Sequence, residues 1–194
     1  CWGSRNYLYQ NNGRDESGNY IFEDVAEKAN VSNPIWSFPV WFWDYNNDGW
    51  EDLMVCSYNY STIPQDIVRE YLQQPVNPES YSFLYRNNKD GTFTNVSSEV
   101  GLDKVLFTMG CNYGDLDNDG FQDFYVGTGG PDMKYIFPNR MFRNSGGSSF
   151  EEITTAGGFG HLQKGHGIAF SDIDNDGDQD VYTVLGGIYS GDVF

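Results

Sequence analysis

The sequence predicts an all-β fold made of four-stranded antiparallel sheets, arranged as blades of a β-propeller. Three observations lead to this prediction. Aromatic residues make up 17% of the 194 residues and Gly occurs 23 times, a composition that favours short strands and tight turns over helices. A nine-residue Asp-rich pattern occurs three times. Hairpin-like segments recur at a fixed distance before each copy of that pattern.

Each copy of the Asp-rich pattern reads D-x-[DN]-x-D-G-x-x-D, and the copies span 44–52, 115–123 and 172–180. Oxygens at positions 1, 3 and 5 converge on one point if the backbone curls sharply, and the Gly at position 6 permits this curl because it lacks a Cβ. Calcium takes six to eight oxygen ligands and tolerates irregular geometry, whereas magnesium prefers a tight octahedron. We therefore expect one Ca²⁺ ion in each loop.

The expected ligands are the side chains at positions 1, 3, 5 and 9 and the backbone carbonyl at position 7. These residues are Asp44, Asn46, Asp48, Trp50 and Asp52 in the first loop; Asp115, Asp117, Asp119, Phe121 and Asp123 in the second; and Asp172, Asp174, Asp176, Asp178 and Asp180 in the third. Because Asn46 replaces an Asp, we expect the first site to be less charged and weaker. Ordinary Asx-rich turns are the alternative explanation, and three matching copies disfavour it.

These loops differ from the helix–loop–helix calcium motif, which needs a Glu at position 12. Val55, Val126 and Thr183 stand at that position. The segments that follow the loops, 53–55, 124–126 and 181–184, are rich in β-branched and aromatic residues, which favours strands. Each loop is therefore expected to join two strands.

A second hairpin precedes each Asp loop, and the Phe that begins its second arm lies 22 residues before the first Asp in all three copies. The pairs are Phe22 and Asp44, Phe93 and Asp115, and Phe150 and Asp172. A typical hairpin turn, Asp90-Gly91, separates the arms of the middle copy. The loops themselves are 71 and 57 residues apart, so the repeat is regular except for one insertion.

Each repeat thus reads strand, Asp loop, strand, connection, strand, turn and strand, which is the composition of a propeller blade. The predicted division is half a blade (strands 3 and 4) over 1–35, a full blade over 36–108 with an insertion at 57–82, a full blade over 109–165, and half a blade (strands 1 and 2) over 166–194. About three blades are fewer than a closed ring needs. We therefore expect a part of a longer propeller, or a segment that other blades or other copies complete.

Two side-chain groups follow from this architecture. Trp36, Trp41, Trp43 and Trp50 are expected to pack between blades, with a sugar-stacking role as the alternative for Trp50. Within the insertion, Pro64 predicts the start of a short helix at the end of the blade away from the Asp loops. This helix is the candidate partner surface, and packing against a neighbouring blade is the alternative.

The hairpins and loops resemble those of the FG-GAP/VCBS repeat family, whose best-known members form the integrin-α-type propeller. The hairpin at 85–93 and the run at 165–177 are similar to the subgroup related to cartilage acidic protein and to bacterial proteins that end in an ASPIC/UnbV domain. The resemblance implies calcium between the first two strands of a blade, on the face opposite the usual ligand face. It also implies an extracellular, cell-surface or periplasmic location.

Composition excludes some functional classes. A formal charge of −17 argues against a nucleic-acid partner because no basic stripe is present to neutralise phosphates. No stretch approaches the roughly 20 apolar residues of a membrane span. Of Cys1, Cys56 and Cys111, at least one is unpaired within the chain, and a Cys56–Cys111 disulfide between blades is left open.

The expected function is that of a non-catalytic binding, adhesion or scaffold module with a protein or glycan ligand. Neither His161 nor His166 belongs to a recognisable nucleophile or zinc motif, and the conspicuous acids are assigned to metal. Two alternatives remain, namely an accessory or catalytic propeller domain of a larger secreted enzyme, and a structural subunit of a cell-surface filament or sheath.

Overall fold

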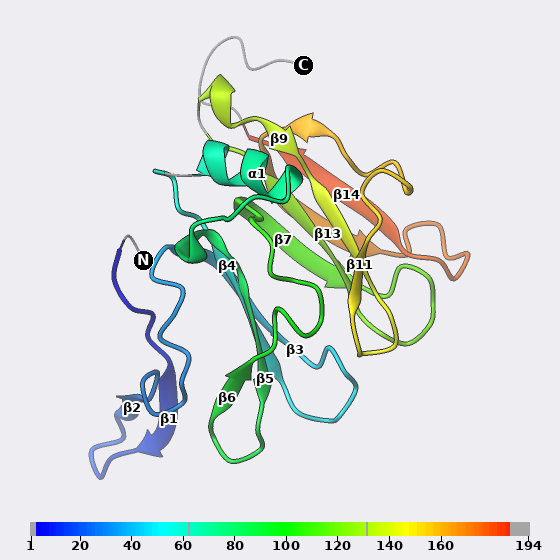
Figure 1. The fold of residues 1–194 in the computed structure, drawn as a ribbon. Coiled ribbons are helices and arrows are strands. Elements are labelled where there is room, and N and C mark those ends of the chain that lie inside the picture. Colours follow the sequence, from blue (N-terminus) through cyan, green and yellow to red (C-terminus); the bar gives the residue numbers. More distant parts are fainter. Residues whose placement is uncertain (1–2, 62, 131, 187–194) are drawn as a thin grey trace.

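The computed structural model describes residues 3–61, 63–130 and 132–186, and strands dominate this part of the chain (Figure 1). Its described residues contain two four-stranded sheets, each an antiparallel meander with its strands in nearly sequential order. The first sheet consists of β3 (Ser37–Trp43), β4 (Asp52–Ser57), β5 (Phe83–Asn87) and β6 (Phe93–Asn95). The second consists of β7 (Thr108–Gly114), β8 (Asp123–Thr128), β10 (Arg140–Asn144) and β11 (Phe150–Glu152).

These two sheets have the architecture of propeller blades, and the all-β prediction is confirmed. A two-stranded hairpin lies on either side of them in the sequence: β1 (Tyr9–Arg14) with β2 (Tyr20–Asp24), and β13 (Gly165–Ser171) with β14 (Asp180–Leu185). A short pair of strands, β9 (Phe137–Pro138) and β12 (Leu162–Gln163), lies between the second sheet and the last hairpin in the sequence.

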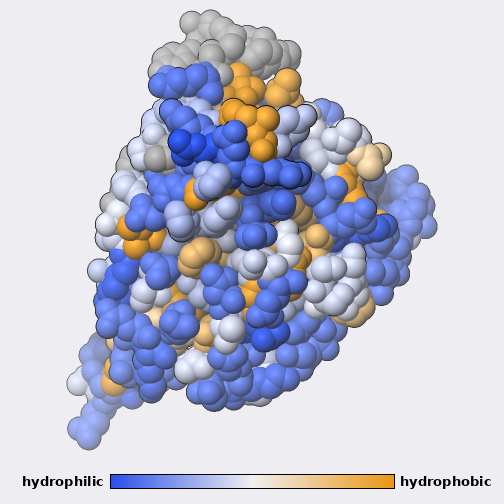
Figure 2. Space-filling view, viewed as in Figure 1, coloured by the Kyte–Doolittle hydropathy of each residue, from blue (hydrophilic) through white to orange (hydrophobic). Residues whose placement is uncertain are grey.

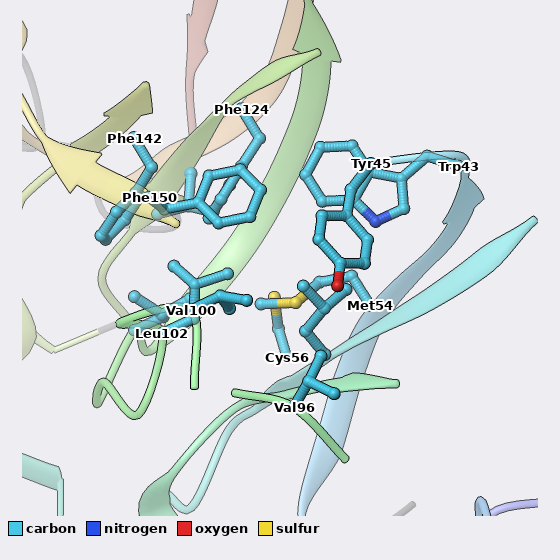
Figure 3. Packing of buried hydrophobic residues seen from close by; sticks show 13 residues of the cluster. Trp43, Tyr45, Met54, Cys56, Val96, Val100, Leu102, Phe124, Phe142 and Phe150 are labelled. Carbon is cyan, nitrogen blue, oxygen red and sulfur yellow. The ribbon is translucent and has the colours of Figure 1, made fainter. Parts of the chain in front are cut away.

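The main core lies between the two four-stranded sheets (Figure 3). Trp43 on β3 stacks on Phe150 with the ring centroids 5.6 Å apart, and it meets the ring of Phe124 edge-on at 5.6 Å. Trp41 lies 5.8 Å from Phe124, so both tryptophans pack between blades as expected. Trp50 does not, because its side chain is 47% exposed in the Asp loop.

The second sheet and the β13–β14 hairpin approach each other through their backbones. A Cβ atom placed on Gly110 would lie 1.5 Å from the carbonyl oxygen of His166, and one placed on Gly127 would lie 2.8 Å from Gly165 backbone atoms. Glycine is therefore required at these points. This close contact fixes the spacing between neighbouring hairpins, and with it the spacing between their Asp loops.

The insertion between β4 and β5 forms α1 (Ile63–Tyr71) and the short 3₁₀ helix η1 (Pro78–Ser80), and a second 3₁₀ helix, η2 (Met133–Tyr135), follows β8. Helix α1 lies at the end of the sheets opposite the Asp loops (Figure 1). Glu70 on α1 forms an ion pair of 3.0 Å with Arg140 on β10. The helix therefore packs against the neighbouring blade.

Within the described residues, no helix has the length and apolar character that a membrane crossing needs. Cys56 and Cys111 are both free thiols. Burial raises the pKa of Cys111 to about 12, and it raises the pKa of Cys56 as well, so both side chains are protonated at neutral pH. The structure therefore lacks the disulfide that the sequence left open at these positions.

Candidate metal centres

The three Asp loops occupy equivalent positions in three hairpins. They join β3 to β4, β7 to β8 and β13 to β14, at the end of the sheets opposite α1 (Figure 1). In each hairpin, the last ladder pair before the loop includes the Asp at position 9: Trp43 with Asp52, Gly114 with Asp123, and Ser171 with Asp180. The position-9 carboxylate is therefore held by the sheet, while the other predicted ligands lie on the loop.

The loop backbones curl in the same way in all three copies. In the first loop, the two carboxylate oxygens of Asp44 accept hydrogen bonds from the N–H groups of Asp48 (2.9 Å) and Gly49 (2.7 Å). Asp115 and Asp172 accept the equivalent pairs of bonds at 2.9–3.1 Å. The position-6 glycines have φ between 85° and 97°, the conformation for which the sequence required Gly.

Carboxylates converge inside this curl. Oxygens of Asp115, Asp117 and Asp123 lie within 4.8 Å of one another, as do those of Asp172, Asp174 and Asp176. In the first loop, where Asn46 replaces one acid, its amide lies 3.5 Å from an oxygen of Asp48. Like charges this close raise the free energy of the folded state unless a positive charge lies among them.

Two of the position-9 carboxylates are fully buried. Asp52 and Asp123 are both 0% exposed, and burial, together with the neighbouring acids of each loop, raises the pKa of each to about 6. Asp123 accepts hydrogen bonds from the N–H groups of Asn144 (2.7 Å) and Leu116 (2.8 Å). Asp52 accepts one at 2.8 Å from the N–H of Asn87, and a backbone hydrogen bond from Tyr45 also favours its charged form.

The third loop is more open. Asp180 is exposed, and one of its oxygens accepts a bond of 3.1 Å from the N–H of Ile173. The difference has a structural cause: Asp52 and Asp123 are covered by the third strand of their own sheets, while β14 is an edge strand among the described residues. Hydrophilic side chains surround this loop (Figure 2).

The backbone N–H of each position-7 residue points into its own loop. Trp50, Phe121 and Asp178 donate hydrogen bonds of 2.8–3.0 Å to the position-5 carboxylates. These bonds fix the orientation of the peptide that precedes the carbonyl expected to act as ligand. The role of these three carbonyls stays a prediction.

The asparagine at position 4 was not assigned a role from the sequence, although it occurs in all three loops. Asn47, Asn118 and Asn175 adopt positive φ values of 55°, 59° and 61°, a region that Asn tolerates better than most residues. The Asn47 amide donates to the Gly120 carbonyl of the second loop at 2.8 Å. The Asn118 amide donates to Gly177 of the third loop at 3.1 Å. The sequence did contain a sign of this role, because Asn occupies position 4 in all three copies of the pattern.

The donor set fits a hard divalent cation. Carboxylate oxygens converge in the second and third loops, and oxygen ligands are those that Ca²⁺ and Mg²⁺ prefer. The nearest positive charges are side chains from the second hairpin of the same sheet: Lys89 lies 3.2 Å from Asp48, and Arg143 lies 3.9 Å from Asp117. Each of these basic groups lies against a single acid of its loop.

A comparison with protein families matches the FG-GAP-like repeat to residues 71–126 and 127–183, more than half of the chain. The chain belongs to the FG-GAP-like repeat family. The first match begins at the end of α1 and ends inside β8, and the second begins inside β8 and ends inside β14. One matched FG-GAP repeat therefore covers the last two strands of a sheet and the Asp hairpin of the next. The narrower resemblance to the cartilage-acidic-protein subgroup stays a prediction.

Proposed function

We propose that this chain is a calcium-stabilised segment of a β-propeller that acts as a non-catalytic binding or scaffold module. The observation that carries this proposal is the convergence of acidic oxygens, which lie within 4.8 Å of one another for Asp115, Asp117 and Asp123 and again for Asp172, Asp174 and Asp176. Carboxylates held this close together, one of them buried, are costly unless a cation is bound among them.

In this proposal, each metal-bound loop holds together the ends of the two strands that it joins. When bound, Ca²⁺ supplies the positive charge that offsets the repulsion between the converging carboxylates. Asp44, Asp115 and Asp172 hold the curl through their bonds to backbone N–H groups. Asp52 and Asp123 are themselves the first residues of the strands that follow their loops. Filling all three sites adds six positive charges and brings the formal charge of −17 to −11.

An extracellular, cell-surface or periplasmic location suits such loops. Most of their ligands lie on exposed hairpin ends, where water competes for the metal. Calcium sites of extracellular modules bind in the range of about 10⁻⁴–10⁻³ M, and weak sites of this kind fill only where calcium is abundant.

We propose the outer face of α1 as a surface for a protein or glycan ligand. The inner side of the helix is anchored through Glu70, whereas Val68, Tyr71 and Leu72 are 54%, 86% and 54% exposed. Hydrophobic side chains reach the surface in this region (Figure 2). Exposed apolar and aromatic groups on a rigid support are typical of binding sites.

Assembly is a second candidate function, which the two end faces favour. Phe38, Val40 and Phe42 on β3 are 46–58% exposed and line a groove of about 370 Å³. At the other end, Tyr182 and Val184 on β14 are 69% and 45% exposed. We propose that further blades, from the same polypeptide or from another copy, cover these faces. Size-exclusion chromatography at several concentrations tests association between copies, and a constant monomeric mass argues against it.

Thermal unfolding with and without calcium tests the proposed function. We expect 2 mM Ca²⁺ to raise the unfolding midpoint relative to a chelator, because the metal binds the folded state, and Mg²⁺ to raise it less. Asp52→Asn should reduce the calcium-dependent shift. Glu16→Gln, which removes one exposed carboxylate from the turn between β1 and β2, outside the Asp loops, is the matched control and should leave the shift unchanged. An identical midpoint in calcium and chelator would rule the proposal out.

A further inference from the structure

The Asp loops of neighbouring blades are joined by side-chain hydrogen bonds. The Asn47 amide in the first loop donates to the carbonyl oxygen of Gly120 in the second, across 73 positions of sequence, at 2.8 Å. The Asn118 amide in the second loop donates to the carbonyl of Gly177 in the third (3.1 Å) and to the carboxylate of Asp178 (2.8 Å). The two bonds to Gly carbonyls both start at loop position 4 and end at position 6 of the following loop.

The acceptor of each bond is a peptide inside the curl of the next loop. The carbonyl of Gly120 belongs to the peptide whose N–H, on Phe121, donates to Asp119 at 2.8 Å. Both polar ends of this peptide are thus held, one by its own loop and the other by Asn47. The same holds in the third loop, where the N–H of Asp178 donates to Asp176 at 3.0 Å. Each bond therefore orients the peptide that leads into the position-7 ligand.

In the curled loops of the structure, the donor asparagine is directed toward the next loop. Asn47 and Asn118 adopt φ values of 55° and 59°, and this left-handed turn lies between the position-3 and position-5 ligands of their loops. Without a positive charge, carboxylate repulsion loosens the curl. The direction of the asparagine amide thus depends on the state of its loop.

We propose that Asn47 and Asn118 are positioning residues that couple the calcium sites of adjacent blades. A filled loop holds its asparagine toward the next loop, which then needs less ordering to bind its own ion. Coupling of this kind is reciprocal, since each site changes the affinity of the other by the same factor. The inference rests on the proposed calcium binding. Because both bonds are exposed, we expect a coupling of about two- to fivefold in affinity, in the lower range for one hydrogen bond.

Nuclear magnetic resonance of the ¹⁵N-labelled chain tests the coupling site by site. The amide signals of Gly49, Gly120 and Gly177 each report on one loop during a titration with chelator-buffered free Ca²⁺. Substitution by Gly removes the amide while retaining access to positive φ. Asn47→Gly should raise the calcium midpoint of Gly120, in the neighbouring loop, about two- to fivefold, and Asn118→Gly should do the same for Gly177.

Asn175→Gly is the matched control. Asn175 has the same loop position and a φ of 61°, but it lies in the last of the three loops. Its substitution breaks neither of the bonds from Asn47 and Asn118, so it measures the local cost of Asn→Gly at its own loop, Gly177, and should leave the midpoint of Gly49 unchanged. Unchanged neighbour midpoints in both Asn47→Gly and Asn118→Gly would overturn the coupling alone. If none of the three glycine signals responds to calcium in the unmodified chain, the proposed metal binding itself fails.

Discussion

Asp52 and Asp123 are acidic side chains that the fold buries completely at the first residue of a strand. Their positions in the nine-residue pattern could be predicted from the sequence, and so could the need for Gly at position 6. Their burial could not, because it depends on β5 and β10, which lie many residues away and cover the loop end of the sheet. The exposed Asp180 has the same pattern and lacks that cover among the described residues.

The expectation for Trp50 was wrong for a related reason. Position 7 was assigned both a ligand carbonyl and a packing side chain, yet the backbone of Trp50 is bound within the loop through Asp48. Its indole is thereby left at the surface, 47% exposed. Aromatic content alone does not distinguish a loop residue from the alternating strand residues Trp41 and Trp43.

The first prediction concerns pH. Because burial raises the pKa of Asp52 and Asp123 to about 6 in the folded state, above the ordinary value of 3.8, the folded chain binds these protons more tightly than the unfolded chain. Without calcium, the free energy of unfolding should therefore rise by about 1–2 kcal/mol as the pH falls from 7.5 to 5.5. Urea denaturation of the calcium-free protein measures this.

Calcium should reverse this dependence, since protons and metal compete for the same oxygens. The stabilisation by saturating calcium is expected to be largest above pH 6 and to shrink as the pH falls through 6. A calcium-dependent gain that stays constant from pH 7.5 to pH 5.5 would show that the buried carboxylates take no part in binding.

At the scale of elements, hairpins were easier to predict than the insertion. Strand pairs follow from local alternation and turn chemistry, and the constant distance of 22 residues between Phe93 and Asp115, or Phe150 and Asp172, placed them in register. Pro64 indicated the start of α1, which runs over Ile63–Tyr71. The helix docks through Glu70 and Arg140, which are 70 positions apart in the sequence. A contact between residues so far apart cannot be predicted from a local sequence pattern.

The ion-pair cluster beneath α1 provides the second prediction. Arg140 pairs with Glu70 (3.0 Å) and Glu152 (2.7 Å), with its side chain 16% exposed. Arg140→Leu leaves both partly buried carboxylates without their partner, so we expect a loss of about 2–4 kcal/mol in the free energy of unfolding. Arg86→Leu, which breaks an exposed pair with Glu99, should cost less than about 1 kcal/mol. Equal losses in urea denaturation would contradict this account.

At the scale of the whole molecule, the two complete blades are held together by aromatic side chains. Trp43, Phe124 and Phe150 form the centre of the core between the sheets (Figure 3). Their burial was expected from the repeat, because blades of a propeller bury their faces against each other. The particular partners depend on how far one sheet is rotated against the next, which the sequence does not specify.

The third prediction compares two tryptophans. Trp43→Ala removes a 1% exposed side chain and leaves a large cavity between the blades, so we expect a loss of about 3–5 kcal/mol in the free energy of unfolding. Trp50→Ala removes a side chain that is 47% exposed and should cost less than about 1 kcal/mol. Both values can be measured by denaturant unfolding in saturating calcium. Similar losses for the two variants would argue against the core as described.

Counting the bound ions shows whether each of the three Asp loops holds one calcium ion. Native mass spectrometry of the chain in calcium, read against the chelator-treated protein, should show three bound Ca²⁺ ions. Asp52→Asn, Asp123→Asn and Asp180→Asn should each lower the number by one or weaken one binding step. No bound calcium in the unmodified chain, or a count that none of the three substitutions alters, would contradict the claim.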